Sequence, residues 1–441
     1  MNEQDLRIQF LASGVCTARQ LAARLGVSQP TISRALARMA GVLRIGRGPA
    51  ACYGLEDPIG DLGASWPLYL MDREGAPEQV GRLHRLAGGP WWLESAEKWP
   101  CLIPEGLSVF PGLPWFLDDV RPQGFLGRAF ARRHGRELGQ EIDPALWSNT
   151  AVAESLLRFG RDLPGAFVLG REALARAMDG GEAFVTTPED RPRNYLHFAS
   201  AILGGEVTGS SAGGEQPKFA AAIAGPDRPR HVLVKFSPPM AQPEGRRWAD
   251  LLFAERTAHR ILAEQGFAVP QTEILDSGDR RFLQVDRFDR TAQGRVPVVS
   301  LRAVDAAFFG LLHTPWADAA HRLQQSGWLD AKDAVRLAQL GAFGRLIHNT
   351  DMHYGNASVI LSRRLPTSLA PVYDMLPMGY RPGLEGQIPG LSAPALADLG
   401  VVAESPERRW AAAFWDTIAH SEMVSPEFRT IARAHRDAVE S

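Results

Sequence analysis

Apolar and polar positions along the chain follow two different periods, and these predict helices and strands in different regions. Apolar residues three or four positions apart predict helices at 3–13, 150–159, 171–178, 246–262, 302–309, 316–326 and 330–348. Short apolar runs bounded by glycine, proline or charged residues predict strands at 68–71, 91–93, 232–236, 272–275 and 281–286, with a further short strand ending at Asp374. A mostly helical remainder therefore follows the strands.

The region after the first helix has the pattern of two short helices joined by a turn. Thr17 and Gln20 have the spacing of a capping box at the start of a helix. Gly26 is expected to end that helix, and Ser28 to begin a second one with Pro30 in its first turn. Two such helices form a helix-turn-helix, a unit that can place its second helix in the major groove of DNA.

Residues 42–55 are expected to add a β-hairpin wing, so that the region resembles the winged helix-turn-helix of bacterial regulators. Residues 1–55 hold seven Arg against Glu3 and Asp5, a net charge of 7 − 2 = +5, and the rest of the chain carries −2 − 5 = −7. This bias favours DNA as the partner, and a small helical domain for protein contacts is the alternative. The side chains expected to reach bases or phosphates are Gln29, Thr31, Ser33, Arg34, Arg38, Arg44 and Arg47.

Length and composition describe a multidomain globular protein. A chain of 441 residues is too long for one ordinary core and predicts about two to four domains. No apolar run is long enough to span a bilayer, and the N-terminus, with Glu3 and Asp5, does not resemble a signal peptide. A cytoplasmic protein without a membrane partner is expected. The cysteines have no metal-ligand spacing and are interpreted as packing residues: Cys16, Cys52 and Cys101.

Lysine is scarce, since only four of the 48 basic residues are Lys. In such a chain a Lys indicates a site that needs a compact ammonium rather than a planar guanidinium. Lys235 lies inside the apolar strand 232–236, where its burial requires an anionic partner. Glu255 on the helix 246–262 is the candidate carboxylate, although a solvated Glu is equally compatible with that helix.

The stretch 208–221, which precedes Lys235, is rich in glycine and small residues. Backbone N–H groups in such a stretch can approach a phosphate closely. The pattern is not that of a P-loop, because no Lys-Ser/Thr pair follows at the Walker spacing. A phosphate-binding loop and a Gly-rich hairpin turn are both compatible with it.

A second polar stretch, residues 347–359, contains Asp351 and, five residues later, Asn356. This spacing suits a carboxylate that faces a hydroxyl nucleophile and an amide that faces a phosphate-bound metal, although such residues also populate plain turns. The order of Gly-rich loop, strand Lys, helix Glu, charged hinge, helices, Asp-x4-Asn loop and Asp374 is that of protein-kinase-like phosphotransferases. It predicts an α+β, bilobal protein-kinase-like fold with a β-rich N-lobe and a helical C-lobe, preceded by the winged helix-turn-helix domain.

Four motifs extend this interpretation to a family: residues 211–218, 285–290, 351–356 and 371–374. Together they resemble the HipA family of bacterial serine/threonine kinases, toxins of type II toxin-antitoxin systems, and the fused N-terminal winged helix resembles the YjjJ branch of that family. With this resemblance we expect four regions. They are a winged helix-turn-helix domain at 1–56, a HipA-type N-terminal subdomain at 57–150, a kinase N-lobe at 151–289 and a helical C-lobe at 290–441.

The resemblance also implies roles for single residues. Asp351 would be the catalytic base, and Asn356 and Asp374 would hold Mg²⁺. Ser211 would be an inhibitory autophosphorylation site, although Ser210 lies beside it and the choice between the two is open. Contacts with ATP would come from Gly213, Gly214, Glu215, Gln216, Pro217, Lys218, Lys235, Glu255, Asp286, Arg287, Phe288, His353, Asn356, Tyr373 and Asp374.

The expected function is ATP- and Mg²⁺-dependent phosphorylation of a Ser or Thr in a protein substrate, joined to a DNA-binding domain that regulates transcription. A separate antitoxin and a homodimer are compatible with it. Two alternatives remain open: a transcriptional regulator whose kinase-like part is a catalytically silent ligand sensor, and a small-molecule phosphotransferase. The sequence does not define the phosphate acceptor.

Overall fold

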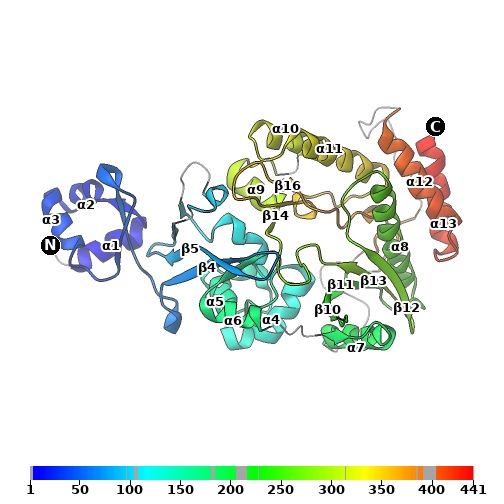
Figure 1. Ribbon diagram of the computed structural model, residues 1–441, viewed down its shortest axis with the longest axis horizontal. Helices are drawn as coiled ribbons and strands as arrows, with labels where there is room; N and C mark the ends of the chain where they lie inside the picture. The colour runs from blue at the N-terminus through cyan, green and yellow to red at the C-terminus, as the bar shows by residue number, and fades with distance from the viewer. Residues whose placement is uncertain are drawn as a thin grey trace.

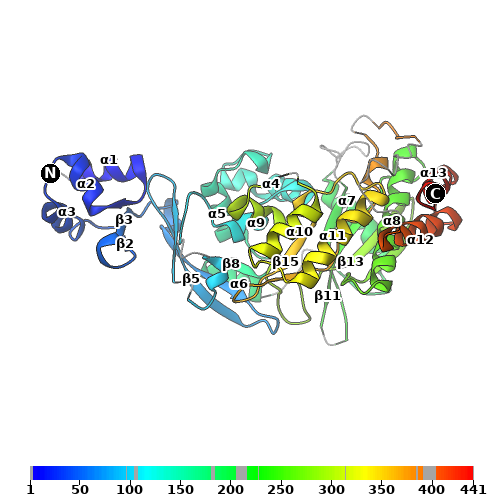
Figure 2. The same ribbon diagram turned by 90° about the horizontal axis from the view of Figure 1, so that it is seen from above.

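The computed structural model describes residues 3–95, 97–103, 108–179, 184–204, 216–226, 228–312, 314–383, 386–390 and 404–440. These residues form an elongated molecule with a small helical unit at the N-terminal end (Figure 1). At the other end lie α12 (Pro406–His420) and α13 (Pro426–Glu440). A view from above shows the same order along the long axis (Figure 2). No helix in the described part of the chain has the length and apolar character needed to cross a membrane.

The N-terminal unit packs three helices against a small sheet of strand order β1-β3-β2. Its core includes Leu6, Phe10, Leu21 and Ile32, all nearly inaccessible to solvent. The helices and strands are α1 (Glu3–Ser13), α2 (Ala18–Leu25), α3 (Gln29–Leu36), β1 (Cys16–Thr17), β2 (Val42–Ile45) and β3 (Cys52–Leu55).

The predicted capping box at the start of α2 is confirmed. The Thr17 hydroxyl accepts from Gln20 N at 3.2 Å, and the Gln20 side chain accepts from Thr17 N at 2.8 Å. Gly26 ends α2 with φ 65°, a left-handed conformation that glycine adopts without strain. Ser28 stands at the N-cap of α3, but its hydroxyl pairs with that of Thr31 instead of capping the helix. Arg38, one of the side chains expected to reach DNA, lies beyond the end of this helix at Leu36.

A middle unit follows, built on a five-stranded sheet of order β7-β6-β5-β4-β8. The boundary expected at residue 150 falls inside this unit, because β8 pairs with β4 in the register Leu68↔Leu169. The segment 151–178 is therefore part of the middle unit and not of an N-lobe. The elements are β4 (Ser65–Met71), β5 (Pro77–Arg85), β6 (Trp91–Glu94), β7 (Val109–Phe110), α4 (Gly124–Leu138), α5 (Asn149–Phe159), β8 (Phe167–Leu169) and α6 (Arg171–Met178).

The next unit carries a five-stranded sheet of order β12-β13-β11-β10-β9. The antiparallel pair β10–β11 sets Lys218 opposite Lys235, and β13 lies on the other side of β11. Figure 1 shows α8 along this sheet and α7 at its lower end. The bounds are β9 (Val185–Thr186), α7 (Arg191–Leu203), β10 (Lys218–Ile223), β11 (Arg230–Phe236), α8 (Pro243–Glu264), β12 (Thr272–Ser277) and β13 (Arg280–Asp286).

The last unit is mostly helical and contains a small sheet of order β14-β15-β16. The prediction of a short strand ending at Asp374 is wrong, because β16 ends at Leu369. The chain then leaves the sheet, and Val372 N donates to Ala268 O at 2.9 Å. Asp374 itself has φ 52°, which no strand residue adopts. Besides α12 and α13, the elements are β14 (Val298–Ser300), α9 (Leu301–Phe308), α10 (Trp316–Gln325), α11 (Ala331–Leu346), β15 (Ser358–Ile360) and β16 (Ser368–Leu369).

Candidate active site

Lys235 lies at the centre of the candidate site, between helix α8 and the loop that carries Asp374. Lys235 is 3% exposed and Glu255, on α8, is 1% exposed. Lys235 Nζ donates to Glu255 Oε1 at 2.6 Å and to Oε2 at 2.7 Å, and it also contacts Asp374 Oδ1. A buried ammonium needs such partners, because an unpaired charge in the interior is costly. The structure thus brings together three residues that are far apart in the sequence.

The charges of this cluster follow from its contacts. Burial by itself would lower the pKa of Lys235, but Asp374 and Glu255 outweigh it and raise that pKa above its usual range. Burial would likewise raise the pKa of Asp374, but Lys235 and Lys218 outweigh it and hold the pKa well below its usual range. Lys235 is therefore a cation and Asp374 an anion at neutral pH. This is the charge pattern that phosphate and metal binding require.

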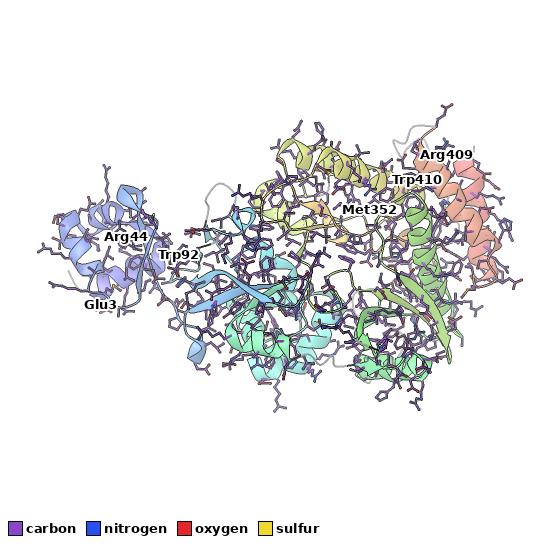
Figure 3. The ribbon with its side chains drawn as sticks, viewed as in Figure 1. Glu3, Arg44, Trp92, Met352, Arg409 and Trp410 are labelled. Atoms are coloured by element: carbon purple, nitrogen blue, oxygen red, sulfur yellow. The ribbon has the colours of Figure 1, made fainter. Side chains whose placement is uncertain are left out.

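The loop after α11 carries Asp351 and is tied to Asp374 through side-chain amides. Asn349 is buried: its Oδ1 accepts from Asp351 N at 3.0 Å, and its Nδ2 donates to Asp374 O at 3.4 Å. Asn356 Nδ2 donates to Asp351 O at 2.8 Å. These bonds fix the backbone of Asp351 relative to that of Asp374. Met352, next in the chain, lies in the middle of the large part of the molecule, far from Arg44 in the N-terminal unit (Figure 3).

His353 directs its imidazole towards Asp351. Its Nδ1 accepts from Gly355 N at 3.0 Å, so the proton of the neutral ring lies on Nε2. Nε2 is 3.9 Å from Asp351 Oδ1. The side chains of His353 and Asp351 are 50% and 38% exposed, so a hydroxyl group can reach the carboxylate from solvent.

Asn356 and Asp374 each carry an oxygen atom of the kind that binds Mg²⁺. This ion prefers oxygen ligands and commonly takes one or two carboxylates together with waters and substrate phosphates. The Asn356 nitrogen is held by Asp351 O, so its amide oxygen is the atom that can face a cation. Asp374 has φ 52°, a left-handed conformation that is uncommon for a residue with a side chain. Such strain is typical of binding and catalytic positions.

Three of the residues expected to contact ATP, Asp286, Arg287 and Phe288, lie at the end of β13. The rings of Phe288 and Tyr373 lie 5.6 Å apart, so the hinge meets the segment that carries Asp374. Asp286 Oδ1 has no hydrogen-bond partner, and its ion-pair contact with Arg230 Nε is 3.5 Å long. Gln216 Nε2 is also buried without a hydrogen-bond partner. Unsatisfied buried polar atoms are costly unless a ligand engages them, and these two fit the edge of a nucleotide site.

The side chain of Arg287, expected to contact ATP, is engaged in ion pairs. Its guanidinium donates to both carboxylate oxygens of Asp162 at 2.8 Å and to Asp289 at 2.9 and 3.0 Å. Pro217 and Lys218 lie at the start of β10, where Pro217 O accepts from Phe236 N at 3.0 Å. Outside the described residues lie Ser210, Ser211, Gly213, Gly214 and Glu215.

Two residues of this site escaped the sequence-based prediction. Asn349 stands in the polar stretch, but nothing in its spacing distinguishes a buried bridging amide from a turn residue. His259 lies one helical turn after Glu255, is 1% exposed, and has no hydrogen-bond partner at either ring nitrogen. Burial, with help from Lys235, lowers the pKa of His259 to about 3, so the ring is neutral beneath the charged cluster. The i, i+4 spacing from Glu255 was the available signal.

Comparison with known proteins identifies the family. Residues 62–178 match the model for the middle domain of YjjJ-like toxins, and residues 210–441 match the HipA-like C-terminal domain. The chain is 36% identical to Toxin YjjJ of Escherichia coli (strain K12) over 438 residues, which cover 96% of this chain and 95% of that protein. The chain belongs to the YjjJ-like branch of the HipA family. The YjjJ-like middle domain ends at residue 178, in agreement with the pairing of β8 with β4.

A more distant relative and a solved structure add to the comparison. The putative kinase Y4dM of Sinorhizobium fredii (strain NBRC 101917 / NGR234) is 27% identical over 325 residues, 70% of each chain. A chain of the Shewanella oneidensis MR-1 complex of HipA, HipB and operator DNA superimposes with a TM-score of 0.51 and 15% identity. That superposition covers 85% of this chain and 96% of the other. It shows that the fold is shared, and the relatives indicate a kinase-like enzyme.

Proposed function

We propose that this YjjJ-like chain is an ATP- and Mg²⁺-dependent protein kinase that phosphorylates Ser or Thr. The observation that carries the proposal is the contact of the buried Lys235 ammonium with both Glu255 and Asp374. Kinase-like phosphotransferases need this ion pair and a metal-binding Asp beside it. Asn349 bonds to the backbones of both Asp351 and Asp374, which supports a common site for the base and the phosphate-binding groups.

Each residue of the site has one role in the proposed reaction. Asp351 accepts the proton of the acceptor hydroxyl, whose oxygen bonds to the γ-phosphorus as the bond to the ADP oxygen breaks. Lys235 binds the phosphates of ATP, and Glu255 holds its ammonium in place. Asn356 and Asp374 would hold Mg²⁺, which neutralises phosphate charge when bound. His353 orients its Nε2–H towards the Asp351 carboxylate from the same loop.

Asp351→Gln tests this assignment. The variant should lose phosphate transfer by at least about a hundredfold, since general base catalysis typically contributes 10²–10⁴, and should still bind ATP. The measurement is transfer from labelled ATP to proteins of a cell lysate, with ATP affinity measured in parallel. Asp179→Gln, at the exposed end of α6, is the control and should behave as wild type. Unchanged transfer by Asp351→Gln would show that Asp351 is not the base, and label found only on a small molecule would favour the alternative phosphotransferase.

We further propose that the kinase modifies Ser211 in its own glycine-rich stretch. A phosphoserine adds about −2 charge, which would repel the phosphates of ATP and inhibit the enzyme. Mapping of phosphorylated residues after incubation with ATP should find Ser211 modified in wild type and unmodified in Asp351→Gln. Modification of Ser210 in place of Ser211 would reassign the site.

The N-terminal unit is proposed to be a winged helix-turn-helix that binds double-stranded DNA. Its support is the exposed position of Gln29, Ser33 and Arg34 on α3 and of Arg44 and Arg47 on the β2–β3 hairpin. Because one such unit reads one half-site, a homodimer is the proposed binding form. An antitoxin partner is proposed from the relative named as a toxin and from the HipA, HipB and DNA complex that shares the fold.

A further inference from the structure

The segment that joins the two kinase-like lobes is held from outside by the middle unit. This hinge segment, residues 286–298, leaves β13 and leads to β14. Asp162 lies in the loop between α5 and β8, and it is 125 residues before Arg287. Asp162 Oδ1 accepts from Arg287 NH1 at 2.8 Å and from Arg290 NH2 at 2.6 Å. One carboxylate of the middle unit therefore binds two arginines of the hinge segment.

Asp289 completes the same network from within the hinge segment. Its Oδ2 accepts from Arg290 NH1 at 2.9 Å and from Gly165 N at 2.9 Å. Arg290 also donates to the backbone oxygen of Leu163 at 2.6 Å. The middle unit and the hinge segment are thus joined through both side-chain and backbone groups. The side chain of Arg290 is 5% exposed and that of Arg287 11%, so water screens these charges little.

Cations exceed anions in this network. Three arginines, Arg287, Arg290 and Arg295, face the two carboxylates of Asp162 and Asp289. Arg295 NH2 donates to Arg161 O at 2.6 Å, but its NH1 is buried without a hydrogen-bond partner. Burial and the neighbouring Arg290 lower the pKa of Arg295 to about 9. Loss of either carboxylate would leave three buried cations with one anion. Removal of either Asp should therefore cost more than removal of one partner from a pair with equal charges.

A second contact holds the hinge segment at its far side. The turn between β4 and β5 packs against residues 291–295: Thr291 Oγ1 donates to Arg73 O at 2.6 Å, and Arg295 N donates to Asp72 O at 2.8 Å. A Cβ on Gly294 would lie 2.0 Å from Asp72 O, so the two backbones touch. The hinge segment is therefore fixed at both of its ends by the middle unit.

We propose that Asp162 is a positioning residue for the nucleotide site, acting through Arg287 and Arg290 on the segment that carries Asp286 and Phe288. The proposal rests on the proposed kinase function. Asp286 and Phe288 flank Arg287 in the chain, and Phe288 packs against Tyr373 beside Asp374. Because Asp162 fixes the position of Arg287, the neighbouring residues Asp286 and Phe288 are also fixed. The residues proposed to contact adenine are then in place before ATP binds. Preorganisation of this kind lowers the cost of binding.

Asp162→Asn tests the proposal in the full-length protein. It keeps the shape of the side chain and removes the charge. Its Kd for ATP should rise about tenfold, equivalent to ~1.4 kcal/mol, while single-turnover transfer at saturating ATP stays within about twofold of wild type. Asp162→Glu should restore part of the affinity. Asp61→Asn is the matched control, because Asp61 pairs with Arg158 in the same unit at 2.7 Å but is 77% exposed. It should bind ATP as wild type does.

Arg287→Lys carries the same test if Asp162→Asn does not fold. It keeps the charge, but one ammonium cannot bind Asp162 through one nitrogen and Asp289 through two others as the guanidinium does. The Kd of this variant for ATP should also rise. A purely structural role would lower the thermal midpoint and the active fraction without changing Kd, and that result would overturn the inference. If the wild type binds ATP and the variants bind it with the same Kd, the inference is overturned and the proposed function is not. Wild-type protein that binds no ATP would overturn the proposed function and the inference with it.

Discussion

At the scale of single residues, the charge of Lys235 is balanced by carboxylates from two different units. Glu255 comes from α8, which covers the β-sheet, and Asp374 comes from the loop after β16. Lys235 and Glu255 are buried and Asp374 is partly buried, so the attraction within the cluster is strong, and leaving the buried members unpaired is costly. His259 and Asn349 fill the space around it without adding charge. The site is therefore sensitive to removal of the one cation that bridges both acids.

Lys235→Met should abolish phosphate transfer and destabilise the protein. Glu255 and Asp374 would then share a buried site without their cation, and breaking a buried ion pair typically costs ~3–5 kcal/mol. Denaturant unfolding followed by tryptophan fluorescence measures the change. Lys98→Met is the control, since Lys98 pairs with Glu78 at 3.5 Å but is 67% exposed, and it should cost less than about 1 kcal/mol. Equal losses in the two variants would contradict the importance of burial.

Asp374 and Asp289 should make stability dependent on pH in the acid range. Lys235 lowers the folded-state pKa of Asp374, and Arg287 with Arg290 lowers that of Asp289, in each case against the effect of burial. Because both folded values lie below the unfolded value of about 3.9, the stabilisation is complete above that pH and is lost as pH falls through the folded pKa. The thermal midpoint should therefore drop steeply below about pH 4. The thermal midpoint of Asp289→Asn should fall less than that of the wild type over the same pH range.

At the scale of elements, the N-terminal unit separates its core-facing residues from its exposed basic ones. In α3, Ile32 and Leu36 are buried, while Arg34 is exposed. The β2–β3 hairpin exposes Arg44 and Arg47 beside it. The end of α3 at Leu36 moves Arg38 into the following turn, where it is exposed and suited to a phosphate more than to a base edge.

Arg47→Ala should weaken binding to DNA of any sequence and should reduce the slope of log K against log salt by about 1. The reason is the loss of one neutralised phosphate. Fluorescence anisotropy with a labelled duplex at several salt concentrations measures both quantities. Arg193→Ala removes an exposed arginine of α7 in another unit and is the control. If the two variants shift the slope equally, the hairpin does not contact DNA.

At the scale of the whole molecule, backbone and side-chain contacts join the successive units. Glu56 forms a β-bridge with Leu86, which continues the N-terminal unit into the middle sheet. Ile45, Leu86 and Trp92 form a shared apolar cluster at this junction, and Trp92 is visible between the two units in Figure 3. The middle unit in turn holds the hinge segment through Asp162. A continuous series of contacts therefore runs from the proposed DNA-binding end to the proposed nucleotide site.

Gly88→Ala should loosen the N-terminal unit. A Cβ at Gly88 would lie 2.7 Å from Phe10 O and 2.9 Å from Gly14 N, which α1 cannot accommodate without moving. Gly89→Ala is the matched control, because Gly89 also has a positive φ of 104° but has no atom within 4 Å of its added Cβ. Limited proteolysis between residues 56 and 62 should be faster in Gly88→Ala than in Gly89→Ala. Equal rates of proteolysis would show that strain at the positive φ, and not the contact of the added Cβ with α1, loosens the unit.

Local spacing was enough to predict much of this protein from its sequence. The periodicity of apolar residues predicted α6 at its observed bounds and most other helices within a few residues. The capping box at Thr17 follows from two residues three positions apart. The order of Lys235, Glu255, Asp351, Asn356 and Asp374 along the chain by itself indicates a kinase-like site. These features depend on neighbours in the chain, which is why the sequence by itself determined them.

Contacts between distant segments were decided only by the tertiary structure. The pairing of β8 with β4, about a hundred residues apart in the chain, moved the segment 151–178 into the middle unit. Asp374 leaves the strand conformation because the Lys235 ammonium and Asn349 hold it in a left-handed turn. Arg287 pairs with Asp162 because the loop after α5 lies beside the hinge segment. These hydrogen bonds and ion pairs join groups that are distant in the chain and become neighbours only in the folded protein. The local periodicity of apolar residues therefore cannot predict them.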